Sequence, residues 1–381
     1  MARSYFYNLH NITTVRSNVD LPELKAFLSA EERQDKVPNI DVSVGRMQPA
    51  TTSSQTPPNE TTGRRYIQYR EGWGPFGFNA EIDIQSPTRI MVRATPVLRF
   101  SPHVLYTNLV EPILRWNFVE KGYALVHGAC IAYGDAAYMV TARTDTGKTT
   151  TILRILDHQR TVPAENGSSA ATFISDDLTL VAPDGAVFAY PKPLTISYHT
   201  VAAVNSPYLT RLERLTLPFQ SRIHSRSGRR LALWLTQSKL PMATINTYIQ
   251  LLVPPPKYHV DQLVPGVKVT SSAHLAGLFI IERGGQGEQR LPNDEAMEIL
   301  LRNCDDAYGF PPYNHIEGFL RQVNGGDLRD QERAIVTKAF TGLPATLLRS
   351  TTLDWAQRIP RLMTPMTTAF QPSAGLAMAA D

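Results

Sequence analysis

The residue types best suited to chemistry stand together in one short run, Arg143-Thr144-Asp145-Thr146-Gly147-Lys148-Thr149-Thr150. An apolar run, 136–140, precedes it, and a helix-like segment, 151–156, follows it. A strand that leads through a tight loop into a helix directs backbone N–H groups inward and forms an anion site. The lysine adds positive charge for the outer phosphates, and the hydroxyl after it can ligate magnesium. The run therefore predicts a nucleoside triphosphate site, with Ala142 where the usual pattern has glycine.

Two adjacent carboxylates, Asp176 and Asp177, follow the β-rich run 171–175. They begin 28 positions after Lys148, which leaves room for one helix and a return to a neighbouring parallel strand. Carboxylates and loop would then meet at one sheet edge. One carboxylate can hold magnesium, together with Thr149, while the other accepts a proton from an attacking hydroxyl, and their order does not tell which does which. The alternative is that both aspartates merely begin a hairpin.

A histidine, His127, lies upstream in the strand-like run 121–132, and a turn at 133–135 leads to the strand before the loop. By itself, a histidine among apolar residues is more often a core group than a catalyst. The order of His127-Gly128, a hairpin, Thr146-Gly147-Lys148-Thr149-Thr150 and Ser175-Asp176-Asp177 resembles the HPr kinase/phosphorylase family and the related phosphoenolpyruvate carboxykinases. An obvious copy of that family's C-terminal HPr-contacting signature is missing, so HPr-kinase-like relatives fit better.

The resemblance implies an α/β fold with an HPr-kinase-like phosphate-loop core. It implies that Lys148 and Thr149 contact phosphate and metal, that Asp176 and Asp177 serve as metal ligand and catalytic base, and that His127 lies near the transferred phosphoryl group. The function expected from it is that of a kinase that uses ATP and Mg²⁺. The acceptor would be a hydroxyl on a protein or peptide serine, a small metabolite or a sugar. The resemblance also allows a homo-oligomer.

Two other functions stay open. A non-catalytic nucleotide sensor or assembly factor would bind ATP without chemistry. A carboxykinase acting on a small organic acid would need an acceptor clamp, for which the candidates are Arg226 and Arg229. A GTPase is disfavoured because no Asn-Lys-x-Asp segment is present, and a transport ATPase because 283–290 lacks the serine of its signature.

Basic residues are the candidates for holding the acceptor. Arg226, Arg229 and Arg230 lie in a glycine-containing stretch that could clamp phosphate or equally be a solvated loop. Arg283 is a candidate for stabilising charge in the transition state. It opens the glycine-rich stretch 283–290, which we expect to be a loop between a strand at 278–281 and a helix at 295–301.

Composition limits the remaining classes. With 381 residues, 43% hydrophobic and 19% charged, the chain is expected to form two domains around a sizeable core. The net charge of +4 is small and its arginines are scattered, so nucleic-acid binding is not expected. The two cysteines, Cys130 and Cys304, lack zinc-like spacing. Neither a signal-peptide core nor a membrane-length apolar run is seen, which predicts a cytoplasmic protein.

We expect three regions along the chain. Residues 1–118 would form a β-rich N-terminal domain with strands at 65–69 and 90–94, a helix over 105–118 and a mobile Ser/Thr/Pro loop near 48–62. Residues 119–345 would form the kinase domain. Residues 346–381 would form a C-terminal extension that ends in a disordered tail.

Overall fold

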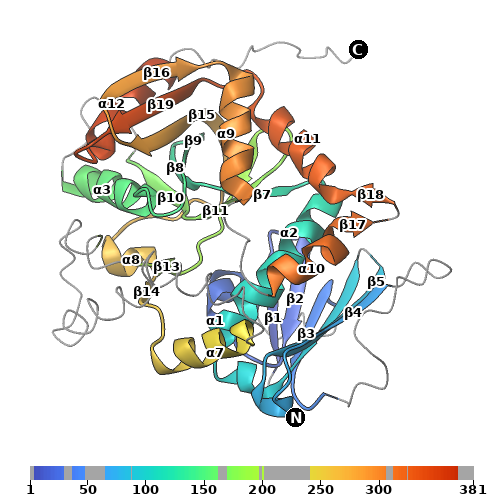
Figure 1. Ribbon diagram of the computed structural model, residues 1–381. Coiled ribbons are helices and arrows are strands. Elements are labelled where there is room, and N and C mark those ends of the chain that lie inside the picture. Colours follow the sequence, from blue (N-terminus) through green and yellow to red (C-terminus); the bar gives the residue numbers. More distant parts are fainter. Residues whose placement is uncertain are drawn as a thin grey trace, which may run out of the picture.

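The chain folds into an α/β structure around two large sheets (Figure 1). The structure is a computed structural model that describes residues 4–29, 37–47, 65–86, 88–161, 170–196, 200, 241–305, 312–323 and 325–367. The expected loop near 48–62 and the expected disordered tail lie outside these residues.

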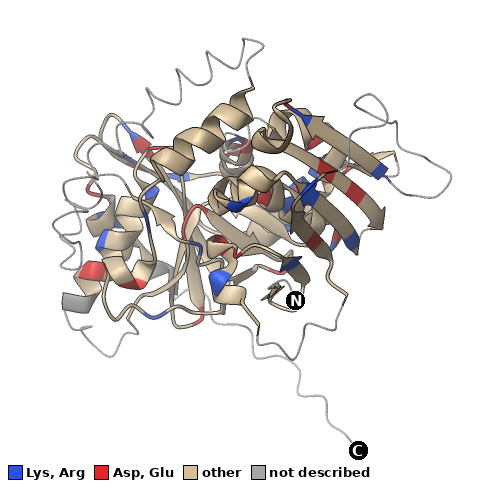
Figure 2. Cartoon of the chain, turned by 90° about the horizontal axis from the view of Figure 1, so that it is seen from below, with Lys and Arg blue, Asp and Glu red and all other residues tan. Residues whose placement is uncertain are grey.

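The N-terminal part of the chain forms a six-stranded sheet. Its strands are β1 (Tyr5–Leu9), β2 (Thr13–Ser17), β3 (Ile40–Val44), β4 (Arg65–Arg70), β5 (Asn79–Ser86) and β6 (Arg89–Ala94), in the order β1-β2-β3-β6-β5-β4. The predicted strands at 65–69 and 90–94 are confirmed as β4 and β6. Acidic and basic residues are interspersed on these strands (Figure 2), and ion pairs join Arg16 to Asp41 and Arg70 to Glu81.

A long helical segment connects this sheet to the second one, as expected for 105–118. It comprises the 3-10 turn η4 (Pro96–Arg99), α1 (Pro102–Leu105), the π-helical η5 (Tyr106–Val110) and α2 (Glu111–Glu120). The predicted apolar stripe of Leu109, Ile113, Leu114 and Phe118 is buried. Helix α2 contacts β7, α10 and α11, and one hydrophobic cluster runs from the first sheet through α2 to the second. The two sheets therefore share a core.

The second sheet contains the strand that leads into the run 143–150. Its strands are β7 (Ala124–His127), β8 (Ala129–Tyr133), β9 (Ala136–Thr141), β10 (Thr172–Ser175), β11 (Leu178–Val181), β12 (Ala186–Phe188), β15 (Ser272–Arg283), β16 (Gly287–Leu291) and β19 (Ala345–Ser350). The order is β10-β8-β9-β15-β12-β11-β7, with β19 also beside β15 and β16 beside β19. Strands β9, β15 and β19 are parallel, so their C-terminal ends meet at one edge.

Helices cover both faces of this sheet (Figure 1), because its central strands are apolar on both sides. Ile131, Tyr138 and Val140 pack under α3 (Lys148–Thr161) and α12 (Trp355–Thr367). The alternate residues Cys130 and Met139 belong to the other core. That core also holds residues of α9 (Asn293–Asp305), α10 (Tyr313–Arg321) and α11 (Leu328–Phe340).

Three details differ from the prediction. Strand β10 is not the neighbour of β9, because β8 lies between them and pairs antiparallel with both. The run 121–132 is two strands: the chain changes partners at Gly128, where a Cβ would lie 2.9 Å from Met139 Cγ. The stretch 283–290 is not all loop, since β16 begins at Gly287 and pairs antiparallel with β19.

Smaller elements complete the described part. They are η1 (Pro22–Phe27), η3 (Gly74–Phe76), α7 (Met242–Leu252), α8 (Val260–Leu263), the pair β13 (Leu194–Thr195) and β14 (Lys257–Tyr258), and the pair β17 (Gln322–Val323) and β18 (Gly326–Asp327). Among the residues that the structure describes, no helix is long and apolar enough to cross a membrane.

Candidate functional site

The loop between β9 and α3 joins a strand to a helix, as the sequence predicted. Strand β9 ends at Thr141 and α3 begins at Lys148. The loop turns back through Thr146 N, which donates to Arg143 O at 3.2 Å. Its left-handed positions are Asp145 (φ +63°) and Gly147 (φ +129°), whereas Ala142 is not one of them. The alanine at the position of the missing glycine is therefore accommodated without positive φ.

Lys148 and His127 lie against each other beneath the loop. Lys148 Nζ is 2.8 Å from His127 Nε2 and donates to Ala142 O at 3.0 Å. Both side chains are buried, and burial lowers the pKa of His127 to about 4, with the charge of Lys148 adding to the shift. The imidazole is therefore neutral at pH 7. Because Nε2 accepts the lysine proton, the hydrogen-bond network assigns the ring proton to Nδ1.

Asp176 faces the start of α3. The hydroxyl of Thr149 donates to Asp176 Oδ2 at 2.8 Å and to Oδ1 at 3.1 Å. Burial raises the pKa of Asp176 to about 6, and the negative charge of Asp177 adds to the rise. A partly buried hydroxyl–carboxylate pair of this kind provides hard oxygen ligands for a cation that would offset the negative charge of the two aspartates.

Asp177 points to the other side of the site. It has φ +70°, so the chain bends at the strand end, and the two carboxylates have different partners. Its side chain is half exposed, with Oδ1 3.3 Å from His127 Nδ1, a contact that lacks hydrogen-bond alignment. Its Oδ2 lies 2.9 Å from Lys192 Nζ. Burial would raise the pKa of Asp177, but Lys192 outweighs it and holds that pKa well below the usual range.

Lys192 is a site residue that the sequence analysis passed over. Its ammonium also contacts Glu111 Oε2 at 3.0 Å, at the start of α2. Burial alone would lower the pKa of Lys192, but Asp177 and Glu111 raise it well above the ordinary value. One available signal was the placement of a charged residue between Pro191 and Pro193. Nothing in the sequence pointed to Glu111.

Of the basic candidates, Arg283 lies at the loop. Arg283 Nε donates to Thr146 O at 2.8 Å from the end of β15. Arg226, Arg229 and Arg230 lie outside the described residues. Of the remaining loop residues, Thr150 Oγ1 lies 3.1 Å from Thr200 Oγ1, and Arg143 and Asp145 are exposed.

Within the described ranges, no group of three or more His, Cys, Asp and Glu side chains is arranged to hold a metal ion. Mg²⁺ does not require one, because it is commonly bound by one or two carboxylates together with phosphate oxygens and water. Thr149 and Asp176 fit that pattern.

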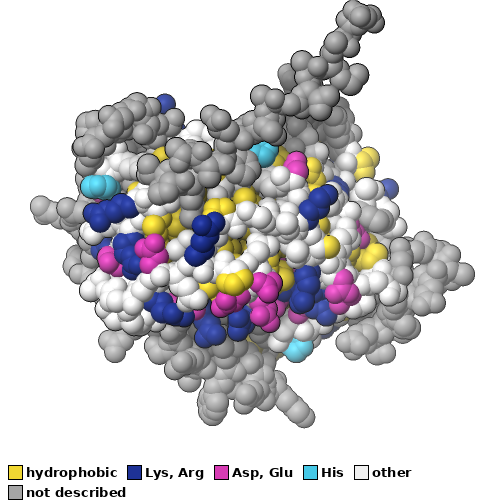
Figure 3. All heavy atoms as spheres, turned by 90° about the horizontal axis from the view of Figure 1, so that it is seen from above, with side chains coloured by type: hydrophobic (Ala, Val, Ile, Leu, Met, Phe, Trp, Pro, Cys, Tyr) yellow, Lys and Arg dark blue, Asp and Glu magenta, His cyan; other side chains and the backbone are white. Residues whose placement is uncertain are grey.

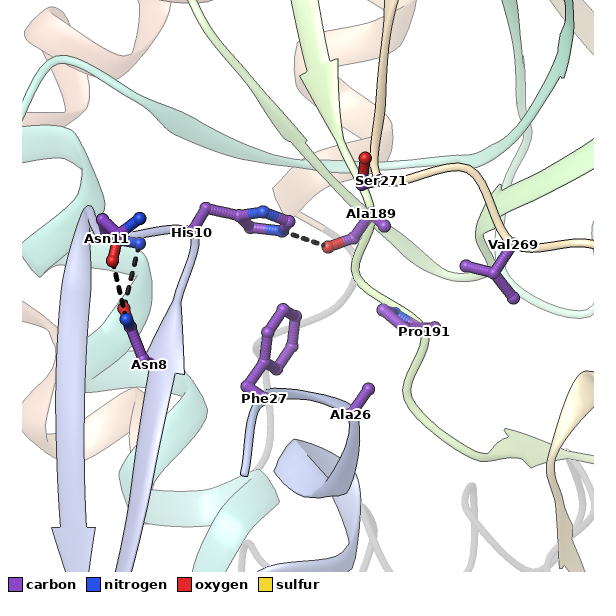
Figure 4. A pocket seen from close by; sticks show the side chains of 9 residues that line it. All are labelled: Asn8, His10, Asn11, Ala26, Phe27, Ala189, Pro191, Val269 and Ser271. Carbon is purple, nitrogen blue, oxygen red and sulfur yellow. Dashed lines mark hydrogen bonds between the residues drawn. The ribbon is translucent and has the colours of Figure 1, made fainter. Parts of the chain in front are cut away.

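A separate pocket of about 380 Å³ lies between the β1–β2 turn and the segment after β12 (Figure 4). The His10 ring donates from Nε2 to Ala189 O at 2.7 Å, and Asn8 and Asn11 hydrogen-bond to each other. Phe27 packs edge-on against the His10 ring. The contact of His10 with Ala189 joins the β1–β2 turn to the segment after β12, and the pocket is lined by neither the loop nor the aspartates.

No protein-family model matches the chain, and no curated protein matches it.

Proposed function

We propose that this protein is a phosphotransferase that moves the γ-phosphoryl group of ATP to a hydroxyl acceptor, with an HPr-kinase-like nucleotide core. The observation that carries the proposal is that the two adjacent carboxylates, Asp176 and Asp177, have different partners on different sides of the site. Asp176 binds the hydroxyl of Thr149 at the helix start, while Asp177, bent away by its positive φ, lies half exposed beside His127.

The loop and Lys148 would hold the triphosphate. An ammonium has three protons, and Lys148 uses two of them on Ala142 O and His127 Nε2, which leaves one for a phosphate oxygen. Thr149 and Asp176 would hold Mg²⁺, which supplies charge neutralisation to the phosphates when bound. Arg283, already at the loop through Thr146 O, could add charge on the same side.

Asp177 is assigned as the proton acceptor. The acceptor hydroxyl gives its proton to the Asp177 carboxylate as its oxygen forms a bond to the γ-phosphorus. The bond from that phosphorus to the bridging oxygen breaks in line, and ADP leaves with the electron pair. A carboxylate that cations keep ionised is a weak base, so its main task is to orient the hydroxyl.

The test is transfer of labelled γ-phosphate from ATP to a panel of peptide, sugar and metabolite hydroxyls in the presence of Mg²⁺. Asp177→Asn should abolish transfer and keep nucleotide affinity, whereas Asp176→Asn should weaken Mg-dependent binding. Asp184→Asn is the matched control, because Asp184 caps only the β11–β12 turn through Ala186 N. Tight ATP binding without transfer to any acceptor would favour the nucleotide sensor, and no binding would refute both functions.

A further inference from the structure

Lys192 has a place in the site that phosphate binding does not explain. Its ammonium lies between two carboxylates from different parts of the fold, 2.9 Å from Asp177 Oδ2 and 3.0 Å from Glu111 Oε2. Only 12% of its side chain and 11% of that of Glu111 is exposed. A lysine whose charge is engaged by two carboxylates is poorly suited to bind phosphate and well suited to hold a neighbouring group in place.

The backbone at Lys192 is itself fixed. Pro191 and Pro193 restrict the chain on both sides. Tyr190 N donates to Ile174 O at 3.2 Å, which ties this segment directly to β10, the strand that ends at the aspartates. The buried Tyr190 hydroxyl lies 2.6 Å from that of Tyr106. The Cα of Lys192 is thus set relative to the carboxylate pair.

Glu111 fixes the other end of the lysine side chain. A lysine has a long flexible stem, and ordering it costs conformational entropy that a single ion pair at a surface barely offsets. A second carboxylate, supplied by the buried start of α2, holds Nζ where it meets Asp177. Helix α2 therefore contributes to the geometry of a site formed on the second sheet.

Asp177 needs such support because it is the more exposed member of the pair. Its side chain is half exposed at a bend, and its contact with His127 is too poorly aligned to fix the carboxylate. Lys192 is the cation that meets its other oxygen. We propose that Lys192, held by Glu111, is a positioning residue that fixes the Asp177 carboxylate for the acceptor hydroxyl. This inference rests on the proposed phosphotransferase function.

The test uses the full chain with an acceptor that the wild type phosphorylates. Lys192→Met should lower kcat by about 10- to 100-fold, the range that small misplacement of a reacting group produces, and leave the affinity for Mg-ATP within about twofold. Lys192→Arg should recover part of kcat, because a guanidinium can meet both carboxylates. A residue with a merely structural role would change stability and not this split between turnover and nucleotide binding.

A second variant covers the case in which Lys192→Met leaves Glu111 buried without its cation and fails to fold. Lys192→Met with Glu111→Gln removes both charges at similar volume and should show the same loss of kcat. The matched control is Lys257→Met with Glu23→Gln, a buried lysine–glutamate pair, 2.6 Å apart, that makes no contact with the aspartates. This control should keep kcat within about twofold.

Three results would overturn the inference. If Lys192→Met and the double variant Lys192→Met with Glu111→Gln transfer phosphate as well as the wild type does, the lysine does not position Asp177. If Mg-ATP affinity falls together with kcat, Lys192 binds nucleotide directly. If the wild type itself transfers nothing, the proposed function fails first and the positioning role fails with it.

Discussion

The hydroxyl of Thr149 donates to both oxygens of the Asp176 carboxylate, although the two residues are 27 positions apart. Helix α3 starts at the loop, and the chain after it returns to the same sheet as β10, so hydroxyl and carboxylate meet beside the loop. Each is a hard oxygen donor, and phosphate oxygens would complete the set around Mg²⁺. The pair therefore offers a direct test of metal-dependent nucleotide binding.

Thr149→Ala should weaken ATP binding in the presence of Mg²⁺ by tenfold or more, about 1.4 kcal/mol, because one metal ligand is lost. Binding measured in EDTA should change little. Isothermal titration calorimetry with Mg²⁺ and with EDTA separates the metal-dependent part of the ATP affinity from the metal-independent part. Thr341→Ala is the control, since that hydroxyl donates to Thr337 O at the end of α11 and is not part of the loop. Equal losses with and without metal would contradict the assignment of Thr149.

Gly147→Ala should impair nucleotide binding through the backbone. Gly147 has φ +129°, a conformation that residues with a Cβ rarely adopt, and the new methyl group would also lie 3.4 Å from Trp355 Cζ3. The expected cost is about 1 kcal/mol or more in unfolding free energy, together with weaker ATP binding.

Gly318→Ala is the opposite case and serves as the control. Gly318 lies in α10 with open space at its Cβ position and no positive φ. Alanine there should stabilise the protein by roughly 0.5–1 kcal/mol in urea unfolding. If both alanine variants shifted stability in the same direction, the strain assigned to the loop at Gly147 would be wrong.

The local parts of the site could be predicted because neighbouring residues determine them. The apolar run 136–140 became β9, the segment after it became α3, and the hairpin after the aspartates became β11 and β12. In each case the pattern of apolar residues and the turn residues that end the element lie within a few positions of one another in the sequence.

The nonlocal parts could not be predicted. Nothing in residues 129–133 shows that β8 inserts between β9 and β10, because strand order is decided by packing of distant segments. Glu111 contacts Lys192 across 81 positions, and no local pattern in α2 indicates that partner. The sequence predicts a loop at β16 because residues 288–290 are polar, and the structure shows them exposed. Pairing with β19 supplies the hydrogen bonds that make this segment a strand.

Glu332→Ala should destabilise the protein by about 3–5 kcal/mol, because it removes a buried carboxylate that compensates buried guanidinium charge. Arg115 Nε donates to Glu332 Oε1 at 2.9 Å, with both side chains 2% exposed, and Arg329 binds the same carboxylate. This contact joins α2 to α11. Urea unfolding measures the loss of unfolding free energy.

The control is an exposed pair on the face formed around β16 and β19, where acidic and basic side chains lie next to one another (Figure 3). There Arg349 Nε is 3.1 Å from Glu282 Oε2, with nearly half of each side chain exposed. Arg349→Ala should change stability by less than about 1 kcal/mol. Similar losses of unfolding free energy for Glu332→Ala and Arg349→Ala would show that burial does not determine how much the Arg115–Glu332 pair stabilises the protein.

Glu23 should give the protein a specific loss of stability in acid. Its Oε1 contacts His103 Nδ1 at 2.7 Å and Lys257 Nζ at 2.6 Å, and the side chain is 1% exposed. Burial raises its pKa, but His103 and Lys257 outweigh burial and lower it from 4.5 to about 2. Because the folded pKa lies below the unfolded one, the unfolded state takes up the proton first as pH falls.

The stabilisation from Glu23 is therefore present above about pH 4.5 and is lost between there and about pH 2, amounting to about 3 kcal/mol over that window. Urea unfolding of the wild type and of Glu23→Gln, measured from pH 2 to pH 7, tests this. The glutamine variant should be less stable at pH 7, and its stability should fall less steeply below pH 4.5. Glu282→Gln, at the exposed pair, should follow the wild-type curve. Parallel curves for wild type and Glu23→Gln would mean that His103 and Lys257 do not hold Glu23 ionised, and the contact of η1 with α1 and β14 would then have to rest on packing alone.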